Sequence, residues 1–479
     1  MLKILMAASE ASPFAKTGGL ADVVGSLPSA LIKQGADVRV ILPKYGTIPT
    51  DLRETMTHHC YNYINLGYRH LYCGIEQVQY NGVVYYFIDN EFYFKRDKLY
   101  GYEDDNERFA FFCKAVMEAI PYLNFVPNII HCHDWQSGMI PVLLEAKYRA
   151  MEQYRGISTV FTIHNLRYQG IYGIENFKDW FSLDHSYFTE DKLEFYKAAS
   201  FMKGGLTYAH KLTTVSNTYA KEIKNPFYGE HMDGLLNARS NDLYGIVNGI
   251  DYEAFNPKKD KLIYQTFSKS NLTGKALNKA ALQKDLNLRE STDTPIIALI
   301  SRLVDQKGLD LIACVLDEIV NEDVQLVVLG TGDYKYEQLF IRASQRYPGK
   351  VSANIRFDNV LAHKIYASSD LFLMPSLFEP CGLGQLISLR YGTLPIVRET
   401  GGLKDTVLSY NEQTGEGNGF SFADYNAHDM LYTIRRALSI YKRKTLRNKL
   451  IKAAMSCDYS WQSSAGKYME LYRLMKPEA

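Results

Sequence analysis

One acidic residue and a glycine-rich turn lie close together at 374–407. Glu379 follows an apolar run that ends at Met374, and Cys381 to Gly384 follow it before a helical pattern begins. An open α/β sheet binds its ligands where strands hand over to helices. The N–H groups at such a helix start favour an anion such as a phosphate. We therefore expect part of a ligand site here, with two ordinary strand-to-helix turns as the alternative.

A second candidate turn lies near the N-terminus, where Lys16 precedes Gly18 and Gly19. Residues 17–24 read TGGLADVV and residues 400–407 read TGGLKDTV, so six of the eight positions are identical. Each copy lies at the expected start of a helix. This match predicts two domains that each present one glycine-rich loop, with the ligand held between them.

Other strand ends carry basic or polar side chains. Arg302 and Lys307 follow a strand expected at 296–300, and His164 follows one expected at 159–163. Arg binds a diphosphate through its planar fork and Lys binds it as a point charge. A nearby carboxylate can accept hydrogen bonds from sugar hydroxyls. These residue types predict a nucleotide-sugar site in which the charge of the leaving group is stabilised electrostatically.

Two histidines with a neighbouring carboxylate raise the question of a metal. His131, His133 and Asp134 end a strand expected at 128–132, and residues i and i+2 of a strand share a face. No third ligand is indicated, and neither C-x-x-C nor H-E-x-x-H occurs. We therefore expect no metal and no cofactor, and we interpret these residues as the lining of a substrate cleft.

The elements that position these side chains alternate between strands and helices. A strand at 3–7, a helix that ends near Gly35 and a strand at 38–42 form the first βαβ unit. We expect a helix at 191–208, a polar connection at 251–294, and a new α/β series from Ile296 with a basic helix at 427–452. A chain of 479 residues is too long for one ordinary domain.

Composition excludes several classes of protein. Lys plus Arg number 54 and Asp plus Glu number 53, so a general nucleic-acid surface is not supported. No run of 18 apolar residues exists, which argues against a membrane span, and the N-terminal apolar run is too short for a signal peptide. Unpaired cysteine spacing fits a reducing, cytoplasmic location. Neither a Walker motif nor an opening G-x-G-x-x-G is present.

An ordered set of motifs resembles the bacterial glycogen synthase and plant starch synthase family, which are retaining glucosyltransferases. The motifs are Lys16-Thr17-Gly18-Gly19-Leu20, His133-Asp134-Trp135, His164-Asn165, Asn248-Gly249-Ile250-Asp251, Ser301-Arg302-Leu303 with Lys307-Gly308, and 375–403.

The resemblance implies an α/β fold of the GT-B type, with two Rossmann-like domains facing across a deep cleft. It implies an N-terminal domain at 1–247, a nucleotide-binding domain at 248–456, and a C-terminal helix at 457–479 that returns to the N-terminal domain. The implied reaction transfers glucose from ADP-glucose to the non-reducing end of an α-1,4-glucan or glycogen, with retention. Because no convincing nucleophile is found, we expect a front-face displacement in which the leaving phosphate helps to take the proton.

The resemblance also implies roles for individual residues. Catalytic roles are expected for Glu379, His164, Arg302 and Lys307. Substrate contacts are expected for Lys16, Gly18, Gly19, Asp22, His133, Asp134, Asn248, Phe357, Cys381, Gly382, Leu383 and Gly384.

Three positions depart from the pattern of some relatives. Gly384 replaces a threonine, Ile387 stands where the wider fold type often has a second glutamate, and Phe357 stands where some relatives have a tyrosine that faces the adenine. Stacking on the adenine survives this last change, but a hydroxyl hydrogen bond does not.

Two other functions remain open at this point. A glucan phosphorylase-like enzyme shares the broad fold type, but needs pyridoxal phosphate and normally a longer chain. A non-catalytic glucan-binding protein is the other alternative, although pure glucan binding needs no cations for a diphosphate.

Overall fold

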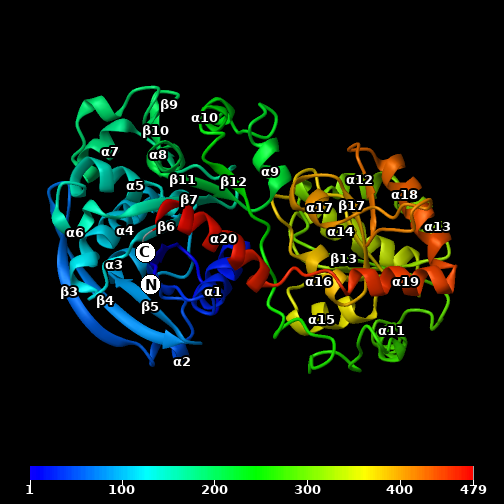
Figure 1. The fold of residues 1–479 in the computed structure, drawn as a ribbon. Helices are drawn as coiled ribbons and strands as arrows, with labels where there is room; N and C mark the ends of the chain where they lie inside the picture. The colour runs from blue at the N-terminus through cyan, green and yellow to red at the C-terminus, as the bar shows by residue number, and fades with distance from the viewer. Residues whose placement is uncertain (478–479) are drawn as a thin grey trace. The chain divides into compact units, whose positions relative to one another are not determined.

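The computed structural model describes residues 1–477, and the chain divides into two compact units (Figure 1). Unit 1 comprises Met1–Ile246 together with the C-terminal segment that begins at Trp461. Unit 2 comprises Val247–Ser460. Each unit is built on its own sheet.

Unit 1 is organised around a large, mostly parallel sheet with the strand order β12-β11-β7-β6-β1-β2-β5-β4-β3. Only β4 and β3, at one edge, run antiparallel to their neighbours. The strands are β1 (Lys3–Ala7), β2 (Asp37–Pro43), β3 (Thr57–Leu66), β4 (Arg69–Tyr80), β5 (Val83–Asp89), β6 (Ile129–His133), β7 (Ser158–Ile163), β11 (Lys211–Thr214) and β12 (Leu243–Gly245). A small second sheet pairs β8 (Ile171–Tyr172), β10 (Ala198–Ser200) and β9 (Glu194–Phe195).

Short helices connect these strands. They are α1 (Gly19–Ile32), α2 (Thr50–Arg53), α3 (Glu91–Phe94), α4 (Asp105–Ala119), α5 (Met139–Leu143), α6 (Glu152–Arg155), α7 (Ile174–Phe181), α8 (Phe201–Tyr208), α9 (Asn217–Glu222) and α10 (Asp233–Ala238).

The C-terminal helix α20 (Trp461–Met475) belongs to unit 1, where it lies beside α1 (Figure 1). The Gln34 side-chain amide donates to the carbonyl of Gln462 at 2.9 Å. The Tyr472 hydroxyl, from the buried side of α20, lies 2.7 Å from Nδ1 of His131 on β6. The prediction that the last helix returns to the N-terminal fold is therefore confirmed.

Unit 2 contains a fully parallel sheet with the order β15-β14-β13-β16-β17-β18. Its strands are β13 (Ile296–Ile300), β14 (Gln325–Leu329), β15 (Val351–Asn354), β16 (Leu371–Met374), β17 (Leu394–Arg398) and β18 (Phe420–Phe422). The central strands β13, β14 and β16 are almost continuously apolar, as expected for strands covered on both faces.

The helices of unit 2 begin with one before β13, and the others lie between the strands or after the last of them. They are α11 (Thr273–Asp285), α12 (Leu309–Cys314), α13 (Leu316–Asn321), α14 (Tyr334–Arg346), α15 (Asn359–Ser368), α16 (Gly384–Arg390), α17 (Gly401–Thr406), α18 (Ala427–Tyr441) and α19 (Lys444–Ala454).

In both sheets, the order of the strands reverses at a central strand. In unit 1, β1 pairs with β2 on one side and β6 on the other, and in unit 2, β13 pairs with β14 on one side and β16 on the other. This reversal marks the place at the C-terminal edge of each sheet where open α/β sheets bind ligands. The predicted α/β class with two Rossmann-like domains is confirmed.

Two predicted helices differ from the structure. The helix expected at 191–208 begins only at Phe201, because Tyr196 and Lys197 adopt positive φ in the turn between β9 and β10. The Ser200 side chain then caps the new helix by accepting from Lys203 N. The basic helix expected at 427–452 is two helices, α18 and α19. Within residues 1–477, no helix is long and apolar enough to cross a membrane.

Candidate functional site

A buried carboxylate organises the N-terminal glycine loop in unit 1. Glu10, which is 4% exposed, lies just after β1. Its carboxylate accepts from Thr17 N at 2.5 Å, from the Thr17 hydroxyl at 2.6 Å and from Gly18 N at 3.3 Å. The Tyr100 hydroxyl donates to the same carboxylate at 2.8 Å. These bonds fix the path of the chain into α1 without using any group of Lys16 or Gly19.

The loop itself leaves its polar and glycine positions accessible. Lys16 Nζ lies 2.6 Å from Asp22 Oδ1, and the two side chains are 49% and 32% exposed. A Cβ atom added at Gly18 or Gly19 would meet no other atom within 4 Å. The fold of unit 1 therefore does not require glycine at these two positions, and the space beside them is open to a ligand.

The second TGGL copy has a different role. A Cβ at Gly401 would lie 2.0 Å from Glu379 O, and a Cβ at Gly402 would lie 2.1 Å from Cys381 O. Gly402 N also donates to the carbonyls of Glu379 and Pro380, both at 3.1 Å. Gly401 and Gly402 are buried. Its glycines let α17 pack against the Glu379–Cys381 turn, and the contact of this copy with a ligand stays a prediction.

Three histidines meet at the C-terminal ends of β6 and β7. His133 Nδ1 lies 3.0 Å from His164 Nε2, and the rings of His131 and His133 pack against each other with centroids 4.2 Å apart and an angle of 31° between their planes. His131 and His133 are fully buried, whereas His164 is partly exposed. Burial lowers the pKa of His164 to about 3, and burial also holds the pKa of His133 well below its ordinary value. Both rings are therefore neutral near pH 7.

Asp134 anchors the backbone beside this cluster. It adopts a φ of 56°, in the left-handed region that non-glycine residues rarely adopt. Its Oδ1 accepts from His164 N at 2.7 Å and Asn165 N at 3.4 Å. Burial raises the pKa of Asp134 to about 7, although these backbone bonds oppose the rise. The carboxylate is used to hold the His164 loop.

In unit 2, an ion pair joins the turns that follow β13 and β16. Lys307 Nζ lies 2.5 Å from Glu379 Oε2, with side-chain exposures of 16% and 9%. The Ser376 hydroxyl donates to the same oxygen at 3.1 Å. Among residues 1–477, no hydrogen bond to Oε1 of Glu379 is found, so this carboxylate keeps one oxygen for a ligand.

Backbone packing holds this ion pair in place. Gly308 adopts a φ of 68°, and a Cβ there would lie 2.0 Å from Pro375 O, so the Lys307 turn lies directly against the Glu379 turn. Leu377 N donates to Gln306 O at 2.9 Å across the same contact. Arg302 is exposed after β13, and within the described part of the chain its guanidinium has no ion pair. The cation is therefore available to an anionic ligand.

The turn after Glu379 combines buried and accessible groups. Cys381 is 5% exposed, and burial raises the pKa of its thiol to about 12 although Asn248 N donates to the sulfur. Asn248 is buried, and its Oδ1 has no hydrogen-bond partner within residues 1–477. Gly382 adopts a φ of 73°, in the left-handed region that favours glycine. Leu383 is partly exposed.

The departure at position 384 has a structural reason. A Cβ at Gly384 would lie 2.9 Å from the Phe372 ring and 3.4 Å from the Tyr366 hydroxyl. The aromatic ring of β16 thus occupies the space that a larger side chain would need. Phe357, the other aromatic departure, is 89% exposed and free to stack on a planar group.

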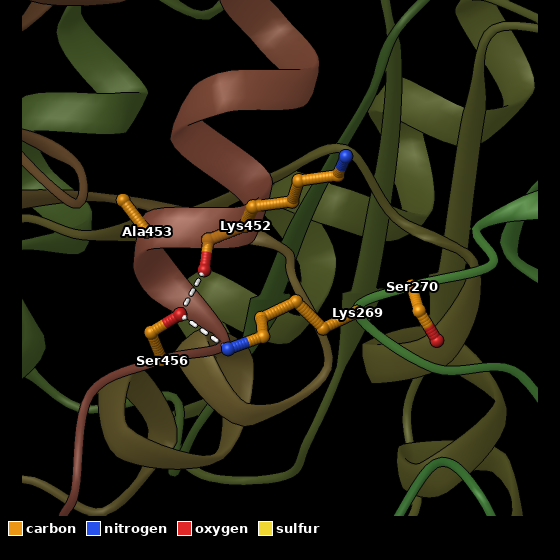
Figure 2. Close-up of a pocket in the computed structure, with 5 residues that line it drawn as sticks. All are labelled: Lys269, Ser270, Lys452, Ala453 and Ser456. Carbon is orange, nitrogen blue, oxygen red and sulfur yellow. Dashed lines mark hydrogen bonds between the residues drawn. The ribbon is translucent and has the colours of Figure 1, made fainter.

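A cavity of about 360 Å³ in unit 2 contains none of the predicted site residues (Figure 2). Lys269, Ser270, Lys452, Ala453 and Ser456 line it, and Lys269 Nζ donates to Ser456 Oγ at 3.1 Å. Within residues 1–477, no group of three or more His, Cys, Asp or Glu side chains is placed to hold a metal ion.

Two of the residues that shape the site were not predicted as site residues. Glu10 stands six residues before Lys16 and Ser376 stands three before Glu379. A charged residue directly after a buried strand was the available signal for Glu10. Ser376 carried no comparable signal, because a serine after a strand is common in ordinary turns.

Comparisons with known proteins show similarity over nearly the whole chain. A family model described as the starch synthase catalytic domain matches residues 3–238, and one described as glycosyl transferases group 1 matches residues 283–456. Glycogen synthases of Desulforamulus reducens and Clostridium acetobutylicum are both 56% identical to this chain, covering 98% of it and 98% and 99% of their own lengths.

Solved structures extend the likeness to the fold. The catalytic domain of starch synthase IV from Arabidopsis thaliana, bound to ADP and acarbose, has a TM-score of 0.91 and 33% identity over 99% of each chain. Sucrose-phosphate synthase from Thermosynechococcus elongatus has a TM-score of 0.64 at 17% identity, with 100% of both chains covered, and shows the fold alone.

The two TGGL copies give a matched pair of substitutions. Gly19→Ala should leave the melting temperature unchanged or slightly raised, because the new Cβ meets nothing and alanine favours a helix by about 1 kcal/mol. Gly402→Ala, at the same motif position, should destabilise unit 2 by several kcal/mol, on the order of 3, through the clash with Cys381 O. Thermal unfolding of both variants checks this, and equal effects would contradict the assignment.

Acid should destabilise unit 1 through its neutral histidines. The pKa of His164 is about 3 in the folded chain against an ordinary 6.5, so the unfolded chain binds the proton first and stability falls as pH drops below 6.5. By pH 5 this contribution is about 2 kcal/mol. Asp134, whose pKa is raised, opposes the trend between about pH 7 and 4.

Replacement of His164 should therefore flatten the pH dependence. In His164→Gln, the loss of stability between pH 6.5 and 5 should shrink by about 1.4 kcal/mol per pH unit. Urea unfolding followed by tryptophan fluorescence measures unit 1 selectively, because all 3 tryptophans, Trp135, Trp180 and Trp461, lie in that unit. Parallel curves for the variant and the unmodified protein would refute the assignment.

Proposed function

The chain belongs to the glycogen synthase and starch synthase family of glycosyltransferases, and on that premise we propose that it transfers glucose from ADP-glucose to the non-reducing end of an α-1,4-glucan with retention of configuration. It is a glucosyltransferase with the two Rossmann-like units of the GT-B type. The free Oε1 of Glu379, beside Lys307, is the observation that carries the proposal.

The cations of unit 2 suit the diphosphate of the donor. An ammonium has three N–H donors, and Lys307 directs one of them to Glu379, which leaves two for phosphate oxygens. The exposed guanidinium of Arg302 can bind the same group through two parallel hydrogen bonds. As the bond to glucose breaks, negative charge grows on the leaving phosphate, and these fixed cations stabilise it.

The glucosyl unit is assigned to hydrogen-bonding groups. Oε1 of Glu379 accepts from a sugar hydroxyl, and the buried Oδ1 of Asn248 accepts from another ligand donor. The Cys381–Gly384 turn shapes the pocket, and the exposed Phe357 ring stacks on the adenine. In unit 1, Lys16 and the open space at Gly18 and Gly19 serve donor binding.

His164 serves as a neutral hydrogen-bonding group. Its pKa of about 3 leaves the ring uncharged at neutral pH, so it orients a hydroxyl and is not a general acid. Retaining hydrolases use two carboxylates about 5 Å apart. Here Glu379 is already paired with Lys307, and Asp22 with Lys16. We assign a front-face displacement in which the acceptor hydroxyl attacks as ADP departs and the leaving phosphate receives the proton.

The direct test is transfer of labelled glucose to glycogen by the purified full chain. ADP-glucose and UDP-glucose should be compared side by side under the same conditions. Incorporation from ADP-glucose that exceeds that from UDP-glucose supports the proposal. Binding of glycogen without any transfer would favour a non-catalytic glucan-binding protein instead.

Lys307→Ala should lower turnover by about 10²–10³-fold, because the protein loses one fixed cation that stabilises the charge of the leaving group. Lys335→Ala is the matched control in the same unit, since Lys335 also forms an ion pair at 2.5 Å, with Asp305, but is 59% exposed. The control should retain full turnover. Circular dichroism and thermal unfolding must show that both variants fold, and unchanged turnover in folded Lys307→Ala would refute the role.

Gly19→Ala should separate donor binding from folding. A methyl group in the open space of the loop should raise KM for ADP-glucose about tenfold or more, while the melting temperature stays unchanged. Initial rates at varied donor concentration measure this effect. An unchanged KM would show that the donor does not approach Gly19.

A further inference from the structure

His133 is the middle member of the histidine cluster and is fully buried. Its ring packs at a tilt against His131, and its Nδ1 lies 3.0 Å from Nε2 of His164. The sequence predicted a substrate contact for His133, but a side chain with no exposed surface reaches a ligand only through a neighbour. That neighbour is His164, which is partly exposed.

The hydrogen bond between the two rings contains one proton, which belongs to either nitrogen. Within residues 1–477, the second nitrogen of His133, Nε2, is buried and has no partner. If the shared proton belonged to His164, neutral His133 would carry its own proton on Nε2, as a buried N–H without an acceptor. Orphaned buried N–H groups are rare and costly. If the shared proton instead belongs to Nδ1 of His133, then Nε2 of His133 carries only an unused lone pair.

We propose that His133 is a positioning residue that donates from Nδ1 to Nε2 of His164 and so fixes His164 with its own proton on Nδ1. His164 then presents an N–H donor to an acceptor oxygen of the glucosyl unit. The identity of that ligand rests on the proposed function, whereas the tautomer of His164 does not.

The ring of His133 packs against His131, and hydrogen bonds hold the His131 ring in place. Both nitrogens of His131 are occupied, Nδ1 by the Tyr472 hydroxyl at 2.7 Å and Nε2 by the Thr162 hydroxyl at 2.5 Å. Thr162 in turn contacts the Thr213 hydroxyl at 2.5 Å. The His131 ring against which His133 packs is thus fixed by α20, β7 and β11.

The backbone of His164 is held separately. Asp134 accepts from the backbone N–H groups of His164 and Asn165, so the loop position does not depend on the ring contact. Loss of the His133 hydrogen bond should therefore change the tautomer and rotation of the His164 ring while the loop stays in place. This separation makes the role of His133 testable.

Nitrogen NMR of the ligand-free full chain, labelled with ¹⁵N-histidine, reads the tautomer directly. The His164 resonances are assigned by their loss in His164→Gln. We expect the Nδ1–H form in the unmodified protein and a mixture of both tautomers in His133→Leu. An Nε2–H form of His164 in the unmodified protein would overturn the proposal, whatever sugar donor the enzyme uses.

Kinetics of three substitutions at position 133 provide the second test. The side-chain amide nitrogen of Asn lies near the position of His Nδ1 and can donate to His164, whereas that of Gln lies near Nε2 and Leu has no donor. His133→Gln and His133→Leu should lower kcat about 10- to 100-fold with little change in KM for the donor. His133→Asn should recover most of that loss.

Thermal unfolding of the three variants separates positioning from folding. Equal losses of kcat in all three, in proportion to their losses of melting temperature, would show a merely structural role and overturn the proposal. Unchanged kcat in folded His133→Leu would overturn it as well. If the unmodified protein transfers no glucose from ADP-glucose, the proposed function fails, and the NMR result still decides the tautomer.

Discussion

In each unit, one buried carboxylate organises the loops of the candidate site, because it needs hydrogen-bond donors or cations around it. Glu10 follows the central strand β1 of unit 1, and Glu379 follows β16, beside the central strand of unit 2. An ionised carboxylate removed from water is stable only when N–H, O–H or cationic groups surround it. Glu10 collects Thr17 and Gly18, and Glu379 collects Lys307 and Ser376, so this requirement shapes both loops from within the protein.

Much of this arrangement could be predicted from sequence because it follows from period and order. Apolar runs that alternate with helical patterns give parallel sheets, and the C-terminal ends of parallel strands share one edge. That reasoning placed Lys307 and Glu379 each at the end of a strand, and the structure joins them at 2.5 Å. It also placed His133 and His164 at strand ends, and the structure brings Nδ1 of His133 within 3.0 Å of Nε2 of His164. Their roles toward a ligand stay predictions, since strand ends show proximity and not contact.

What the sequence could not predict depends on tertiary packing. Nothing local distinguishes Gly19 from Gly402, because their surrounding letters agree, yet only Gly402 lies against another backbone. The start of α8 was missed because the β9–β10 turn depends on two residues with positive φ, Tyr196 and Lys197, which sequence rules seldom allow. The hydrogen bond at Nδ1 of His131 likewise depends on Tyr472 of α20, which lies 341 residues away in the sequence.

The two glycine pairs differ in the amino-acid substitutions that they can accept. Variation at positions 18 and 19 is constrained by chemistry alone, since no protein atom lies within 4 Å of an added Cβ at either position. A substitution at position 401 or 402 must first be compatible with folding, because an added Cβ there would clash with the backbone. A library of substitutions for altered donor preference is therefore best directed to the first pair, where most variants would still yield folded protein to screen.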